Sequence, residues 1–144
     1  MSSNFFGLLM ALLKARKDRA VATSSRVHGE WHRARGFKAQ LDEYACEYET
    51  QFLSAARKSD SVRHLQEQMD FGRRLRDTAH AQEPELLALS QRAVAAKQHA
   101  LLETERYKTV QQFHRRQRQN AIRDQERRDQ KEIEELIQVR FRSL

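Results

Sequence analysis

Apolar residues recur along the first third of the chain at alternating spacings of three and four. Such a repeat is typical of a coiled-coil seam, the narrow apolar stripe through which helices pack. Nine of thirteen consecutive positions are apolar, and they predict a helix over about residues 3–57. The positions are Leu13, Arg16, Ala20, Thr23, Val27, Glu30, Ala34, Phe37, Leu41, Tyr44, Tyr48, Gln51 and Ala55.

A second register with the same spacing follows a short polar stretch. Ser59, Asp60 and Ser61 are turn formers and helix N-caps, and they predict a turn at about 58–61. Ten of the fourteen positions that follow are apolar, which predicts a helix over about 62–140. The positions are Leu65, Gln68, Gly72, Leu75, Ala79, Gln82, Leu86, Leu89, Ala93, Ala96, Ala100, Glu103, Tyr107 and Val110.

Two amphipathic helices joined by a short turn fold back on one another. We therefore expect an all-α protein, a long antiparallel two-helix coiled coil (a helical hairpin) that forms a single domain over residues 1–144. If the turn is centred between residues 59 and 60, the numbers of residues that face each other add to about 119. Tyr48 should then meet Phe71, and Val110 should meet Leu9.

Two features modify the second helix. Pro84 lacks a backbone donor and crowds the preceding turn, so we expect a kink or short break near residues 81–83. After Val110 the apolar stripe ends, and the first helix has no residues left to pair with the second. From about Arg115 the second helix should therefore project alone, which indicates that something else surrounds it, because lone polar helices are marginally stable in water.

Composition supports helices and gives no room for an enclosed substrate cavity. One proline, four glycines and 33% charged residues are typical of long helices. The net charge of +7 suggests nucleic acid, an anionic membrane or an acidic protein surface as partner. Cys46 is the only cysteine, which fits a reducing cytosol. The apolar run "NFFGLLMALL" is too short to span a bilayer, and we interpret it as the start of a helix rather than as a membrane-surface anchor.

No motif supports catalysis, a cofactor or a metal, and we predict a protein that is not an enzyme. His28 and His32 lie one turn apart with Glu30 between them, but the glutamate is misplaced for a zinc helix and no third ligand is evident. The basic stretch from Arg106 to Lys131 is followed by too little apolar repeat for a basic-zipper DNA reader. It is either a solvated helix face or a surface for a partner with an acidic or polar channel.

Large seam residues have two interpretations that can both hold. Apolar seam residues usually form core, but a two-helix seam does not cover large side chains completely, and tyrosine tolerates partial exposure. Exposed aromatic side chains are enriched at protein interfaces. The residues concerned are Leu41, Tyr44, Tyr48, Phe71 and Leu75.

Three segments together resemble the flagellar export protein family FliJ. They are "QLDEYACEYETQF", "MDFGRRLRDTAHAQEPEL" and "RRDQKEIEELIQVRF", and the resemblance covers about residues 37–140. It implies a coiled-coil stalk similar to the central stalk of rotary ATPases. It also implies binding to the hexameric export ATPase and the membrane export gate, and the handling of export chaperones.

The resemblance places the export-gate contact at Leu41, Tyr44, Tyr48, Phe71 and Leu75. We expect the ATPase contact on the projecting helix, because stalks of this kind enter a ring. The residues expected there are Arg115, Arg116, Arg118, Arg123, Arg127, Arg128, Ile133, Leu136 and Ile137.

We therefore predict a non-enzymatic coupling factor of flagellar type III export. It should lie in the cytoplasm and associate peripherally with the inner membrane at the flagellar base, through the export apparatus. No small-molecule substrate is expected. The alternatives are the equivalent stalk of a virulence type III secretion system and, from another class, a basic helical nucleic-acid-binding protein.

Overall fold

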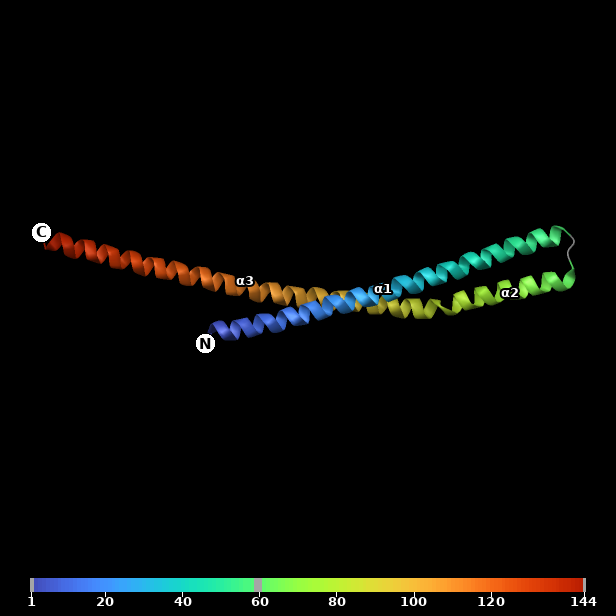
Figure 1. Ribbon diagram of the computed structural model, residues 1–144, viewed down its shortest axis with the longest axis horizontal. Coiled ribbons are helices and arrows are strands. Elements are labelled where there is room, and N and C mark those ends of the chain that lie inside the picture. Colours follow the sequence, from blue (N-terminus) through green and yellow to red (C-terminus); the bar gives the residue numbers. More distant parts are fainter. Residues whose placement is uncertain (1, 59–60, 144) are drawn as a thin grey trace. The chain divides into compact units, whose positions relative to one another are not determined.

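Almost all of the described part of the chain is helical, and it contains no strand. The computed structural model describes residues 2–58 and 61–143, and the predicted turn centre at Ser59 and Asp60 lies outside them, as does Leu144. Helix α1 spans Ser2–Arg57, α2 spans Val62–Ala81 and α3 spans Glu83–Arg142 (Figure 1). The all-α class expected from the shortage of helix breakers is confirmed.

Local sequence accounts for the start of α2. Ser61 has extended backbone, and its Oγ accepts a hydrogen bond of 3.2 Å from the backbone N–H of His64. This is the N-cap interaction expected of a serine that precedes a helix, since it satisfies one of the first unpaired N–H groups.

The interruption between α2 and α3 lies beside the single proline. Helix α2 ends at Ala81, and the backbone N–H of Gln82 bonds to the Ala79 carbonyl at 3.2 Å. Pro84 is the second residue of α3, where its missing N–H leaves no helical hydrogen bond broken. Regular bonding is re-established when the N–H of Leu86 donates to the Gln82 carbonyl at 2.9 Å. The proline is therefore accommodated by starting a new helix.

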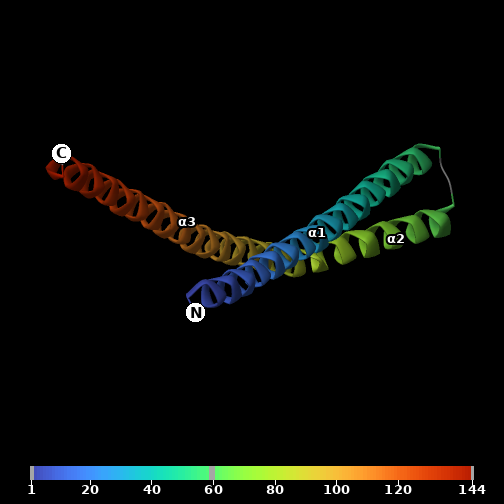
Figure 2. The same cartoon turned by 60° about the vertical axis from the view of Figure 1, so that its left-hand side comes forward.

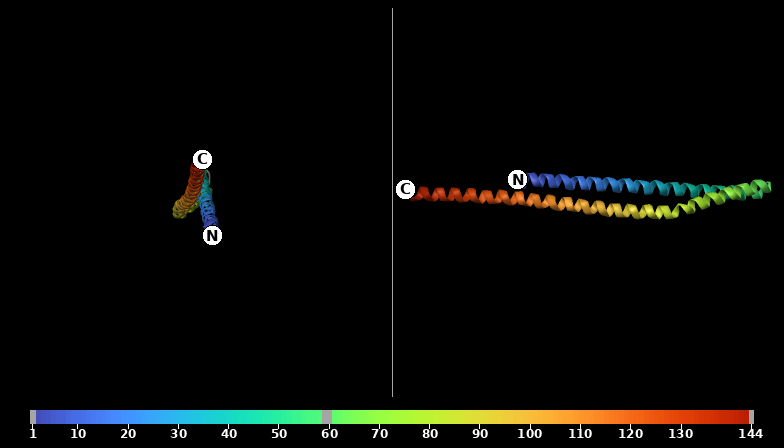
Figure 3. Two further views of the ribbon diagram at one scale, coloured as in Figure 1. Left: turned by 90° about the vertical axis from the view of Figure 1, so that its left-hand side faces the viewer. Right: turned by 90° about the horizontal axis from the view of Figure 1, so that it is seen from below.

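Contacts divide the chain into two compact units. One comprises residues 19–100, in which α1 lies beside α2 and the first part of α3 (Figures 1 and 2). We call it the hairpin unit. The other, the terminal unit, comprises residues 1–18 and 101–144, in which the first turns of α1 lie beside α3 (Figure 3). The assignment of the whole chain to a single domain stays a prediction.

Burial follows the second register at every position. All fourteen of its residues, from Leu65 to Val110, are buried or half-buried. Small side chains account for the deepest burial, with Ala79, Ala93 and Ala100 all in the core. Residues without large side chains let the opposing backbone approach closely, so little solvent reaches this stripe.

The first register is correct at Leu13 and at every seventh residue after it, and it is wrong at the positions between them except Glu30, which is half-buried. Leu13, Ala20 and each seventh residue after them are buried or half-buried, but Phe37 and Tyr44 are exposed. Ala45 lies in the seam instead and is only 1% exposed. The spacing therefore runs four then three from Leu13, the reverse of the order predicted.

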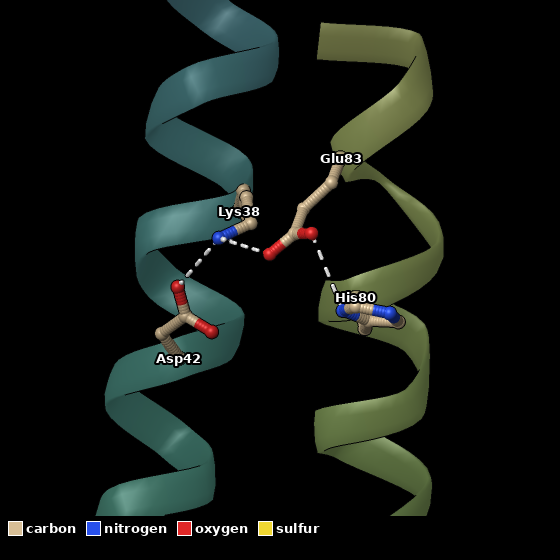
Figure 4. A network of polar contacts seen from close by, with 4 residues as sticks. All are labelled: Lys38, Asp42, His80 and Glu83. Atoms are coloured by element: carbon tan, nitrogen blue, oxygen red, sulfur yellow. Dashed lines mark hydrogen bonds and ion pairs between the residues drawn. The ribbon is translucent and has the colours of Figure 1, made fainter. Parts of the chain in front are cut away.

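Other seam positions of α1 show the same one-residue shift. Lys17, Ser24, Trp31, Lys38 and Phe52 are half-buried where their preceding neighbours were expected. Lysines fit a seam when the aliphatic stem is covered and the ammonium group reaches a partner. Figure 4 shows the partners of the half-buried Lys38, whose Nζ lies 3.2 Å from Asp42 Oδ2 and 3.7 Å from Glu83 Oε1.

Candidate functional site

An aromatic patch on the hairpin unit contains the five residues predicted to contact the export gate. Its centre is the pair Tyr48 and Phe71, whose ring centroids lie 4.6 Å apart at 49°. This pairing across the hairpin is the one that the numbering symmetry predicts, and it is confirmed. Tyr48, Leu41 and Leu75 are half-buried, whereas Phe71 is 44% exposed and Tyr44 is 51% exposed.

Gly72 of α2 lies opposite Tyr48 of α1. It is buried, and a Cβ built on it would lie 3.7 Å from the Cβ of Tyr48, which is ordinary van der Waals contact. The bare backbone of α2 thus lies directly under the tyrosine. The Tyr48 ring contacts Phe71, and Phe71 remains 44% exposed.

A salt bridge borders the patch. The Nε of Arg76 donates a hydrogen bond to Glu49 Oε1, and about half of each side chain is exposed. This hydrogen bond lowers the pKa of the Glu49 carboxyl and raises the pKa of the Arg76 guanidinium. Both groups therefore remain charged at neutral pH, and they join α1 to α2 beside the aromatic pair.

A groove of about 230 Å³ continues the patch toward the turn. Tyr48, Phe52 and the exposed Met69 give it apolar walls, with Arg73 and Arg76 at its border. Sequence reasoning missed Phe52 because the predicted register of α1 was shifted by one residue. Met69 lies outside the second register, and only its place next to the seam residue Gln68 on α2 could have indicated that it lines the groove.

A polar network ties α1 to the junction between α2 and α3 (Figure 4). Glu83, the first residue of α3, forms an ion pair with Lys38 of α1, and its other carboxylate oxygen lies 3.3 Å from Nδ1 of His80 in α2. One carboxylate thus bridges three helices at the point where proline interrupts the backbone. The network positions the end of α2 that carries Leu75.

The terminal unit has a short packed region. The Phe6 ring lies 6.4 Å from the Phe113 ring and 4.7 Å from the His114 ring, and Lys17 Nζ lies 4.6 Å from the Tyr107 ring centroid. These contacts join the first turns of α1 to α3 through aromatic and cation–π interactions.

Beyond His114, α3 is exposed at every described residue as far as Ser143. This stretch carries all of the residues predicted to contact the ATPase. They are Arg115, Arg116, Arg118, Arg123, Arg127, Arg128, Ile133, Leu136 and Ile137. None of these arginines has an ion pair within the described part of the chain. The patch belongs to the hairpin unit and this segment to the terminal unit.

Metal binding, membrane crossing and disulfide formation have little support in residues 2–58 and 61–143. They contain no group of three or more His, Cys, Asp and Glu side chains placed to hold a metal ion. None of their helices has an apolar stretch long enough to cross a bilayer. Cys46 is exposed and forms no disulfide. The His28 ring lies 5.5 Å from the Trp31 ring, so the aromatic neighbour of this histidine is a seam residue.

Comparison with known proteins bears on the whole described chain. Neither the curated proteins nor the solved structures gave a match. A family model described as "Flagellar FliJ protein" matches residues 4–143, which is almost the full length. This range includes the aromatic patch, the packed end of the terminal unit and the exposed arginine segment, and so the chain belongs to the flagellar FliJ protein family.

Proposed function

We propose that the protein is a non-enzymatic stalk that couples the hexameric export ATPase to the membrane export gate and assists the handling of export chaperones. The observation that carries this proposal is the presence of two exposed surfaces of different chemistry on one helical chain. One is aromatic and belongs to the hairpin unit, and the other is rich in arginine and belongs to the terminal unit.

Family membership sets the frame for this proposal. The FliJ family is a non-catalytic component of the flagellar export apparatus, so a role in flagellar type III export follows from the match over residues 4–143. The individual partners are the proposal. We place the chain in the cytoplasm at the flagellar base, where contact with the export apparatus would keep it at the inner membrane.

The aromatic patch is suited to the gate contact. Tyrosine and phenylalanine lose little side-chain entropy on binding and bury a large area, which is why aromatic residues dominate interface energetics. Tyr44 and Phe71 are about half exposed, so they are available without unfolding the hairpin. Leu41, Tyr48 and Leu75 are half-buried and support them from the seam.

The exposed segment of α3 is suited to a ring-shaped partner. A helix of this length without tertiary contacts gains little from burial, and a surrounding partner would supply that burial. Its arginines form bands of positive charge that can pair with carboxylates in a channel. Farther along, Ile133, Leu136 and Ile137 are exposed on one side and would give a second, apolar contact.

The gate assignment is tested by replacing Tyr44 and Phe71 with serine. The affinity for purified export gate should fall at least about tenfold, because the double variant loses two exposed aromatic anchors. Circular dichroism at 222 nm should stay unchanged. Phe37→Ser is the matched control, because Phe37 is exposed in the same unit but outside the patch. If the double variant binds the gate as well as the control does, the assignment is wrong.

The ATPase assignment is tested by truncation after Arg115 and by charge reversal. The truncated chain should keep the hairpin unit folded and lose stimulation of ATP hydrolysis by the export ATPase. Arg123→Glu with Arg127→Glu should weaken binding in a salt-dependent way, because exposed charges are screened. Arg57→Glu with Arg74→Glu is the matched control in the hairpin unit. Full stimulation by the truncated chain would exclude this contact.

A further inference from the structure

A groove of about 570 Å³ lies on the terminal unit, between the first turns of α1 and the part of α3 that follows Phe113. We call it the terminal groove. A cavity of about 150 Å³ holds a benzene molecule in a protein core, so a large side chain of another molecule fits here. The lining residues that matter are Phe6, Gly7 and Met10 of α1 with His114, Arg118 and Ala121 of α3.

The terminal groove offers apolar surface that is open to solvent. The Phe6 and His114 rings form part of its wall, and their centroids lie 4.7 Å apart. Met10 is half-buried, and its flexible thioether adapts to the shape of a contact. Gly7 has no side chain and Ala121 has only a methyl group. A Cβ built on Gly7 would have nothing within 4 Å, so the groove is open beside this residue.

Arg118 gives the terminal groove a positive charge that the chain itself does not neutralise. Its guanidinium forms no ion pair among residues 2–58 and 61–143. Residues 1–17 and 106–123 contain no aspartate or glutamate, so neither helix has a carboxylate on any face near the groove. The next acid, Asp124, lies six residues beyond Arg118, about 9 Å farther along α3. A carboxylate that pairs with Arg118 therefore has to come from another molecule.

Continuity with the arginine segment selects that molecule. Arg118 belongs to the segment of α3 that we assign to the export ATPase, and it also lines the terminal groove. A ring that surrounds α3 at Arg118 would therefore also meet Gly7 and Met10 of α1, which line the same groove. An apolar wall beside one unpaired guanidinium fits an apolar side chain that has a carboxylate next to it.

We propose that the terminal groove receives an apolar side chain of the export ATPase, and that a neighbouring carboxylate of the ATPase pairs with Arg118. This inference rests on the proposed function, and it extends the ATPase contact from α3 to Gly7 and Met10 of α1. An apolar anchor in a pocket with a charge-assisted hydrogen bond beside it is typical of the residues that dominate interface energies.

Filling the groove by Gly7→Leu tests the inference. A side chain at Gly7 enters open space, and leucine favours a helix more than glycine does, so the chain should stay folded. The concentration of full-length protein that half-maximally stimulates the export ATPase should rise at least about tenfold. Gly36→Leu is the matched control, because a Cβ on Gly36 also has nothing within 4 Å and Gly36 lies in the hairpin unit. It should stimulate as the unaltered protein does.

A double-mutant cycle shows whether Arg118 acts at the groove. Arg118→Gln should weaken binding of the ATPase in the unaltered chain, but it should add little to the loss in a chain that already carries Gly7→Leu. Arg127→Gln is the control, since Arg127 lies in the same exposed segment about 14 Å farther along α3. Its effect should be the same with and without Gly7→Leu, because distant sites act additively.

The possible failures are distinguishable. If the unaltered protein does not bind the export ATPase, the proposed function is wrong and this inference is wrong with it. If the unaltered protein binds and Gly7→Leu stimulates as well as Gly36→Leu does, the inference alone is wrong. Additive losses from Gly7→Leu and Arg118→Gln would also overturn it. Self-association that Gly7→Leu abolishes would instead assign the groove to a second copy, and sedimentation with anionic vesicles that Gly7→Leu abolishes would assign it to a lipid surface.

Discussion

Replacement of Gly72 by alanine should stabilise the hairpin beneath the aromatic pair. Glycine in a helix interior is about 1 kcal/mol less favourable than alanine, because it loses more backbone freedom on folding. The added Cβ would lie 3.7 Å from the Tyr48 Cβ, so the new methyl group gains contact without a clash. A buried methyl adds up to about 0.8 kcal/mol.

The expected gain is therefore about 1 to 2 kcal/mol in the free energy of unfolding. Gly36→Ala separates the two contributions, because a Cβ at Gly36 would have nothing within 4 Å and so measures helix propensity alone. That control should gain about 1 kcal/mol, with the remainder in Gly72→Ala coming from packing against Tyr48.

Urea unfolding followed by circular dichroism at 222 nm gives both values, and 1 kcal/mol corresponds to roughly 3 °C in the thermal midpoint. A Gly72→Ala variant less stable than the unaltered protein would refute the reasoning. It would mean that α1 and α2 approach more closely at Gly72 than 3.7 Å allows, and that the seam requires a bare backbone there.

Three further changes follow from single contacts. Glu103 is 4% exposed in the seam, and its Oε2 lacks a hydrogen-bond partner among the described residues. Glu103→Leu should therefore raise the thermal midpoint, although it removes the 3.2 Å hydrogen bond from Arg106. A lower midpoint would contradict this. Pro84→Ala restores a backbone donor and should slow amide hydrogen exchange between residues 82 and 86, whereas unchanged exchange would show that the break does not depend on the proline. The pKa of Glu49 is lowered by the hydrogen bond from Arg76, so its contribution to stability is complete above its usual pKa of 4.5 and is lost as pH falls through the lower folded value. Thermal midpoints should therefore fall on acidification slightly less in Glu49→Gln than in the unaltered protein, and identical pH profiles would exclude the effect.

Much of the fold could be read from local sequence. Few helix breakers and long runs of helix-forming residues determine the three helices, and Ser61 and Pro84 account for the boundaries on either side of α2. The buried stripe of the second register is narrow, because small residues such as Ala79 and Ala93 are flanked by polar ones. The pairing of Tyr48 with Phe71 followed from the hairpin symmetry, so the centre of the aromatic patch was predictable as well.

Only the tertiary structure decided which side of α1 faces its partner. Tyr44 and Ala45 are adjacent, and in a helix their side chains point about 100° apart, so both lie near an edge of the same stripe. Counting apolar residues favoured Tyr44, whereas packing favours Ala45, because a methyl group fits between close backbones and an exposed tyrosine ring keeps its hydroxyl in water. A groove beside Trp31, between α1 and α3, depends on the same choice. It is formed by residues of α1 and α3 that are far apart in the sequence, and their proximity is set by the burial of seam side chains of both helices at once.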